Sequence, residues 1–182
     1  FMVAAPLLLL ANPFPVFMWS LPPGPRHALG RLLRPGNPLR LFLFHITRMP
    51  VAWTLGVVLL WSWHVPAAYN AALGSDLVHN LEHISFFVSA LLLWWPVVNP
   101  VPKLHGQIHY GLRLLYLVPT LVQNTVLGAY ITLSDSVLYS YYTQVPPLWG
   151  MDPLEDQQAG GLIMWVMGDM MYLLVFLVLV VV

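Results

Sequence analysis

The sequence contains no cysteine and has few charged residues. Seven Lys and Arg balance seven Asp and Glu, and together these types make up 8% of the 182 residues, whereas soluble domains carry about 25%. The absence of thiols excludes disulfides and every zinc–thiolate or copper–thiolate site. A net charge of zero offers no broad basic surface, so we expect no nucleic-acid partner. Any metal site must therefore use His, Met, carboxylates or backbone atoms.

Hydrophobic residues are abundant instead. They make up 59% of the chain, and the mean hydropathy is +0.74. This composition predicts an all-α, polytopic transmembrane helix bundle, with residues 1–182 forming a single integral-membrane domain in a lipid bilayer. The chain begins inside one apolar run and ends inside another, so we expect the natural protein to continue beyond one or both ends.

Apolar stretches of membrane-crossing length recur along the chain. A helix of about 20 residues crosses a hydrocarbon core of about 30 Å. Tryptophans cluster at the ends of the second and third stretches, as expected for the aromatic belt at a membrane interface. We therefore predict about five spans, which cover residues 1–20, 48–65, 77–98, 111–134 and 158–182.

The basic residues are restricted to two of the connections between these spans. All seven Lys and Arg lie within 21–47, with Arg48 at its edge, or within 99–113. The alternate connections, 66–76 and 135–157, contain none. Because basic loops stay on the cytoplasmic side, we expect the two basic connections in the cytoplasm and the other two outside.

The third predicted span begins with a potential metal site. Asp76, His79 and His83 lie on one face of a helix, and the two histidines have the i, i+4 spacing that lets one helix offer two imidazoles to one ion. His64 ends the preceding span at the same predicted depth. Three imidazoles and a carboxylate suit copper or zinc, with Glu82 as a further candidate ligand. Alternatively, His79 caps the helix and His83 bonds a neighbouring helix through Glu82 or a carbonyl.

The last span carries a methionine stripe. Met164, Met167 and Met171 have i, i+3, i+7 spacing, and their thioethers are soft ligands suited to Cu(I). Methionine also fills gaps in apolar packing, and this second interpretation is favoured.

A single carboxylate, Asp169, lies well inside the same span. It points about 160° away from the stripe at 100° per residue, so one site does not use both. A carboxylate in a span needs a partner. We expect it to pair with the fourth span or to face a channel; the candidate partners are Gln123, Asn124 and Thr125.

The sequence also predicts where the last helix begins. Asp152 is a predicted N-cap, Pro153 occupies the first helical position, and Glu155 completes a capping box. No nucleophile elbow, phosphate-binding loop or HExxH motif is present, so we do not expect an enzyme.

Several blocks of sequence together resemble one family. They are Trp63-His64-Val65-Pro66, His79-Asn80-Leu81-Glu82-His83, Trp94-Trp95-Pro96, Leu154-Glu155-Asp156-Gln157-Gln158 and Gly160-Gly161-Leu162-Ile163-Met164-Trp165. In this order, over about residues 40–170, they resemble the bacterial CtaG family of multi-span assembly factors for haem–copper cytochrome c oxidase.

The resemblance implies a multi-pass protein of the bacterial cytoplasmic membrane that helps to assemble the oxidase. It further implies that copper is supplied to the catalytic subunit from the outer side, with His64, His79 and His83 as ligands. The family usually has a His-Met-x-x-His stretch before the first apolar run, and the sequence given lacks it. Two alternatives stay open: a structural or accessory subunit without metal, and a haem-binding protein that uses His64 with His79 or His83 as axial ligands.

Overall fold

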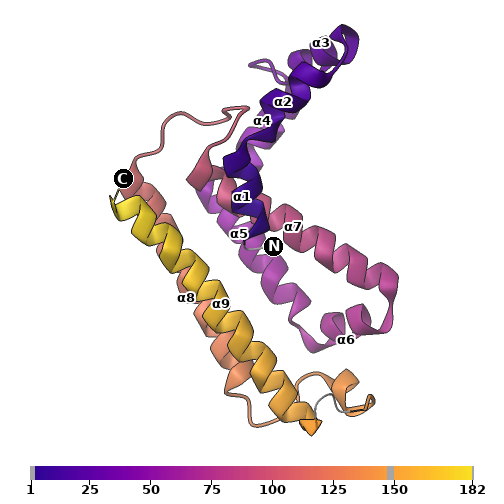
Figure 1. Cartoon of the computed structure of the whole chain (residues 1–182). Helices are drawn as coiled ribbons and strands as arrows, with labels where there is room; N and C mark the ends of the chain where they lie inside the picture. The colour runs from indigo at the N-terminus through magenta and orange to yellow at the C-terminus, as the bar shows by residue number, and fades with distance from the viewer. Residues whose placement is uncertain (1–2, 147–149, 182) are drawn as a thin grey trace. The chain divides into compact units, whose positions relative to one another are not determined.

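Every regular element in the described residues, 3–146 and 150–181, is a helix in the computed structural model (Figure 1). The predicted all-α class is confirmed. The elements are α1 (Ala4–Ala11), α2 (Pro13–Ser20), α3 (Pro23–Leu32), α4 (Pro38–Ile46), α5 (Met49–Trp63), α6 (Pro66–Gly74), α7 (Asp76–Val98), α8 (Tyr110–Thr132), the 3-10 helix η1 (Ser140–Thr143) and α9 (Pro153–Val181).

Proline sets where many of these helices begin. It occupies the first helical position, where its missing N–H costs no hydrogen bond and its fixed φ suits the helix. The helices that start this way are α2, α3, α4, α6 and α9. As a consequence, the connections predicted at 21–47 and 66–76 contain the short helices α3, α4 and α6.

The structure corrects the predicted number of spans. Among the described residues three helices, α7, α8 and α9, are long and apolar enough to cross a membrane, and the pair α4 and α5, bent by 68°, raises the number to four at most. The predicted first span, 1–20, is divided at Asn12, whose φ of 47° is left-handed. Each half, α1 and α2, has eight residues, a length of about 12 Å.

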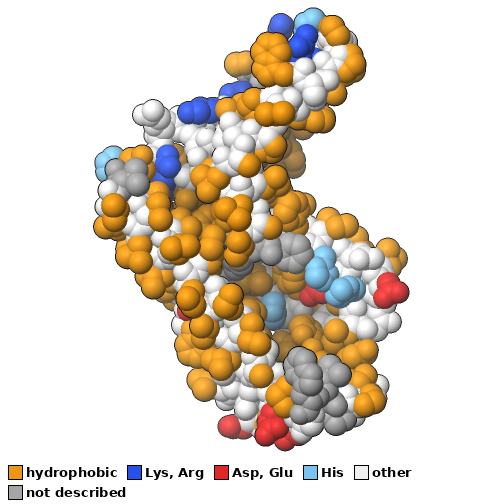
Figure 2. Space-filling view, viewed as in Figure 1, with side chains coloured by type: hydrophobic (Ala, Val, Ile, Leu, Met, Phe, Trp, Pro, Cys, Tyr) orange, Lys and Arg blue, Asp and Glu red, His pale blue; other side chains and the backbone are white. Residues whose placement is uncertain are grey.

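The chain groups into two compact units. Unit 1 comprises residues up to 56 together with 87–113, and unit 2 comprises 57–86 together with residues from 114 onward. The single domain that we predict for 1–182 stays a prediction. Within unit 1, Figure 2 shows Lys and Arg side chains over α3 and α4. One of them, Arg40, donates hydrogen bonds to the carbonyls of Leu33 and Lys103, both at 3.0 Å.

Unit 2 is held together by close packing of α8 against α9. A Cβ placed on Gly128 would lie 2.6 Å from the Cβ of Trp165, and one on Gly168 would lie 2.5 Å from the Nδ2 of Asn124. A Cβ on Gly161 would lie 2.9 Å from the backbone nitrogen of Thr132. Glycine thus allows the two backbones to approach, as small residues do between helices in membranes.

The predicted start of α9 is confirmed. Asp152 accepts hydrogen bonds from the backbone N–H groups of Leu154 (2.8 Å) and Glu155 (2.9 Å). Glu155 in turn accepts from the backbone N–H of Asp152 at 3.1 Å, which closes the capping box. The helix begins at Pro153, five residues before the predicted span.

We expect Gly128→Ala to lower the free energy of unfolding by about 1–3 kcal/mol, because the added methyl forces α8 and Trp165 apart. Thermal unfolding of the detergent-purified protein measures this. Gly160→Ala is the matched control on α9, since a Cβ there meets nothing within 4 Å. Equal unfolding temperatures for the two variants would show that the α8–α9 contact is not tight at Gly128.

Candidate functional site

Three metal-ligand side chains converge on the first two turns of α7. One ligand atom from each of His79, Glu82 and His83 lies within 4.8 Å of the others. The Nε2 atoms of His79 and His83 are 3.0 Å apart, at hydrogen-bond distance, and the ring centroids are separated by 4.3 Å. Metal–nitrogen bonds of 2.0–2.1 Å at a tetrahedral angle would place two nitrogens roughly 3.3 Å apart. The two imidazoles therefore already stand close to a chelating arrangement.

This arrangement, which we call the α7 cluster, is open to its surroundings. Both histidines are exposed and Glu82 is half-buried. The i, i+3, i+4 spacing places the three side chains on one helical face. The Nε2 atom of His83 lies at hydrogen-bond distance from His79, a contact within the helix that neither sequence interpretation predicts.

The structure does not add His64 or Asp76 to the α7 cluster. Among the described residues, the group of three ligands within reach of one ion contains neither. His64 lies beside α7, with its ring centroid 6.2 Å from that of Phe86. The end of α5 is tied to α7 by a hydrogen bond of 2.7 Å from the Trp63 indole N–H to the Ser85 hydroxyl. Asp76 is exposed at the start of α7.

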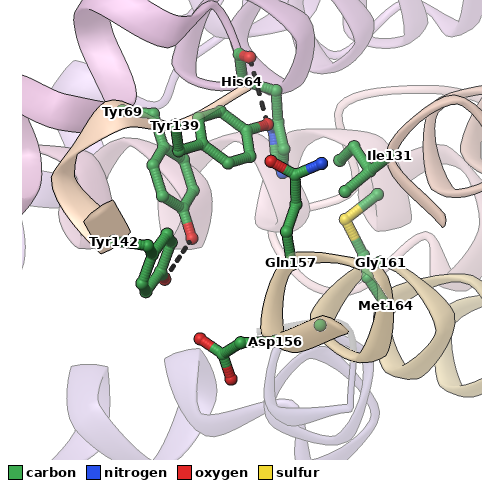
Figure 3. Close-up of a pocket in the computed structure, with 10 residues that line it drawn as sticks. His64, Tyr69, Ile131, Tyr139, Tyr142, Asp156, Gln157, Gly161 and Met164 are labelled. Carbon is green, nitrogen blue, oxygen red and sulfur yellow. Dashed lines mark hydrogen bonds between the residues drawn. The ribbon is translucent and has the colours of Figure 1, made fainter. Parts of the chain in front are cut away.

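His64 instead lines a cavity of about 220 Å³ within unit 2. Figure 3 shows the cavity between α6, the segment around η1 and the first turns of α9. Its polar and polarisable lining comprises His64, Tyr69, Tyr139, Tyr142, Asp156, Gln157 and Met164. The sequence alone singles out neither Tyr139 nor Tyr142, because only the fold brings the η1 segment to α6.

The tyrosines form one network. The hydroxyls of Tyr69 and Tyr142 are 3.1 Å apart, and the Tyr69 and Tyr139 rings stack with centroids 3.9 Å apart. The Tyr139 hydroxyl donates to the backbone carbonyl of His64 at 3.3 Å. Burial raises the pKa of Tyr139 to about 12, and burial also raises the pKa of Tyr69. Both phenols therefore stay protonated at neutral pH.

The hydrogen bonding of His64 fixes its tautomer. Nδ1 lies 2.7 Å from the carbonyl oxygen of Leu60. Because a carbonyl only accepts, Nδ1 carries the proton and Nε2 keeps a lone pair. In the neutral ring, Nε2 is therefore the nitrogen that can bind a metal.

The methionine stripe does not converge on one point. Met164 lines the cavity, whereas Met167, one turn further along α9, is 63% exposed. Met171 is half-buried another turn away. A site that uses all three thioethers has no support in this arrangement. Packing accounts for Met164, which lies against the apolar cluster that contains Leu127 and Ile131.

Asp169 pairs with α8, as the sequence predicts. Its carboxylate accepts a hydrogen bond from the Asn124 amide at 3.0 Å and one from the Thr125 hydroxyl at 2.6 Å. Gln123, the third predicted partner, accepts instead from the Trp61 indole N–H at 3.3 Å. The carboxylate therefore connects α9 to α8, and the α7 cluster does not include it.

The fold and these side chains define a membrane-embedded helical protein that presents imidazole, carboxylate and thioether groups outside its packed interior. The chain belongs to the family of cytochrome c oxidase caa3 assembly factors (Caa3_CtaG), whose model matches residues 1–182. The resemblance seen in the sequence is thus confirmed over the whole chain. No curated protein and no solved structure gives a match.

Replacing Asp169 by Leu is expected to lower the free energy of unfolding by about 1–3 kcal/mol, because the amide of Asn124 loses its partner in a buried position. Asn124 is 1% exposed, so solvent does not compensate. Asp169→Asn keeps an acceptor for Asn124 and is expected to unfold close to the wild type. Detergent-phase thermal unfolding compares the two, and equal losses would argue against the hydrogen bond as the cause.

Proposed function

We propose that this assembly factor handles copper for the oxidase, with the α7 cluster as its acquisition site. The observation that carries the proposal is the convergence of His79, Glu82 and His83, with the imidazole nitrogens 3.0 Å apart. Membership of a cytochrome c oxidase assembly family supplies the context, because a haem–copper oxidase needs copper in its catalytic subunit. The role is therefore one of carrying a metal to a partner and not of catalysing a reaction.

The chemistry of the cluster suits a transferable ion. Two imidazoles and a carboxylate bind divalent copper or zinc. Three protein ligands leave at least one coordination position to water, and open sites of this kind exchange their ligands more readily than closed structural sites. Because both histidines are exposed, a partner can reach the ion directly.

The distribution of charge supports an outer location for this site. The α7 cluster follows the connection 66–76, which contains no Lys or Arg, and all seven basic residues lie in the two alternate connections or at their edge. By the positive-inside rule the α7 cluster then faces the outside of the cytoplasmic membrane. Acidic side chains gather in unit 2 around the start of α9 (Figure 2), on the connection assigned to the same side, and attract cations.

The haem alternative draws less support. Haem ligation needs two histidines that face each other across a macrocycle. His79 and His83 are instead hydrogen-bonded to each other, and the cavity beside His64 measures about 220 Å³, below the roughly 300–1,000 Å³ of sites for organic ligands.

The double variant His79→Ala/His83→Ala is expected to lose at least about tenfold in Cu(II) affinity, since both nitrogen ligands are removed. Metal analysis and competition titration of the detergent-purified protein measure this. His27→Ala is the control, because His27 is an exposed histidine on α3. Glu82→Gln is expected to weaken binding less, as it keeps one oxygen donor.

In cells, the double variant is expected to lower the copper content and the activity of the oxidase, and added copper is expected to restore part of that activity. Unchanged affinity in the double variant would remove the α7 cluster as the site. Normal affinity for copper together with a failure to assemble the oxidase would favour the alternative of a structural or accessory subunit.

A further inference from the structure

The cavity in unit 2 offers a second, chemically different set of ligands. The only unprotonated nitrogen on the His64 ring is Nε2, because Nδ1 donates to the Leu60 carbonyl. A hydrogen bond from the other ring nitrogen to a carbonyl is the arrangement that orients metal-binding histidines. His64 therefore has the tautomer and the support of a ligand, and its ring borders the cavity (Figure 3).

The second donor is the thioether of Met164. Its side chain borders the same cavity, and Figure 3 shows the sulfur on the side of Ile131. Met167, by contrast, is 63% exposed. A thioether is a soft ligand that prefers Cu(I) to divalent ions, and the apolar packing around Met164 disfavours an ion of higher charge.

The other polar groups of the cavity are poor competitors for an ion. The phenols of Tyr69 and Tyr139 have other partners, since the Tyr69 hydroxyl lies 3.1 Å from that of Tyr142 and the Tyr139 hydroxyl donates to the His64 carbonyl at 3.3 Å. The Gln157 amide is occupied, since its oxygen accepts from the Leu138 N–H at 2.7 Å and its nitrogen donates to the Ser136 carbonyl at 3.2 Å. One imidazole and one thioether remain, together with the carboxylate of Asp156.

We propose that this cavity is a Cu(I) site, in which Nε2 of His64 and the sulfur of Met164 are the two principal ligands. One neutral nitrogen and one thioether suit a monovalent soft ion, whereas the Asp156 carboxylate on the same lining is a hard donor that such an ion does not prefer. Two nitrogen and sulfur ligands are too few for the four-coordinate site that Zn(II) takes. The protein then holds two sites of different hardness, the exposed α7 cluster for divalent copper and the cavity for monovalent copper.

The inference rests on the proposed copper-handling function for its biological meaning, but the two sites share no ligand. Copper that moves from the α7 cluster to the cavity must gain one electron. We propose only that each site binds its own oxidation state of copper. Binding at one site is therefore measurable when the other has been removed, so the two proposals fail separately.

The first test uses X-ray absorption at the copper edge on the full chain in detergent, loaded anaerobically with Cu(I), in the His79→Ala/His83→Ala background. We expect a sulfur scatterer in the first coordination shell. Met164→Leu, which keeps the volume, is expected to remove the sulfur signal, and Met167→Leu, the matched control on α9, is expected to keep it. His64→Gln is expected to weaken Cu(I) binding by at least about tenfold.

A second measurement needs no substitution, so its outcome does not depend on whether a variant folds. Ag(I), a redox-inert soft ion, is expected to shield Met164 from oxidation by peroxide, while Met167 oxidises at its usual rate; peptide mass spectrometry follows both residues. Absence of sulfur scattering, its persistence in Met164→Leu, or equal oxidation of both methionines with and without Ag(I) would overturn the cavity site. Shielding of Met164 in a protein whose α7 cluster binds no Cu(II) would overturn the proposed acquisition site and leave this inference standing.

Discussion

The contact between the backbones of α8 and α9 is the constraint on which unit 2 depends. Glycine at positions 128, 161 and 168 leaves one helix without a Cβ at each of these close approaches, and the carboxylate of Asp169 is satisfied there by Asn124 and Thr125. In a hydrocarbon environment, helices gain little from hydrophobic burial against each other, so short distances and hydrogen bonds have to supply the association. This contact positions α9 beside α8, and with it the wall of the cavity that Asp156 and Met164 line.

Local chemistry made part of the structure predictable. The capping box at Asp152 and Glu155 is a pattern within four residues, and it determines the beginning of α9 without help from the rest of the chain. The pairing of Asp169 follows from a strong physical requirement, because a carboxylate in an apolar span must find a donor and Asn124 and Thr125 are among the few on α8. The i, i+4 histidines meet because helix geometry alone brings them together.

The features that the sequence did not reveal depend on tertiary contacts or on the cost of particular backbone angles. Hydropathy marks 1–20 as one span, but the left-handed Asn12 divides it. Predicted depth groups His64 with His79 and His83, whereas in the structure its ring is bonded to the Leu60 carbonyl and lies beside Tyr69. Tyr139 and Tyr142 come from a connection with no periodicity, and their meeting with Tyr69 depends on the arrangement of α6 and η1.

The hydrogen bond between the two imidazoles of the α7 cluster has a consequence for the thermodynamics of metal uptake. At 3.0 Å the two Nε2 atoms are joined by a single proton, because one nitrogen must donate and the other accept. An ion that takes both nitrogens has to displace that proton, and because a neutral imidazole keeps one proton, the donor ring must carry it on Nδ1 once its Nε2 binds the ion. Entry of the ion therefore breaks the contact between the two rings and changes the tautomer of one of them, so part of the free energy of binding is spent on undoing an internal hydrogen bond of the free helix.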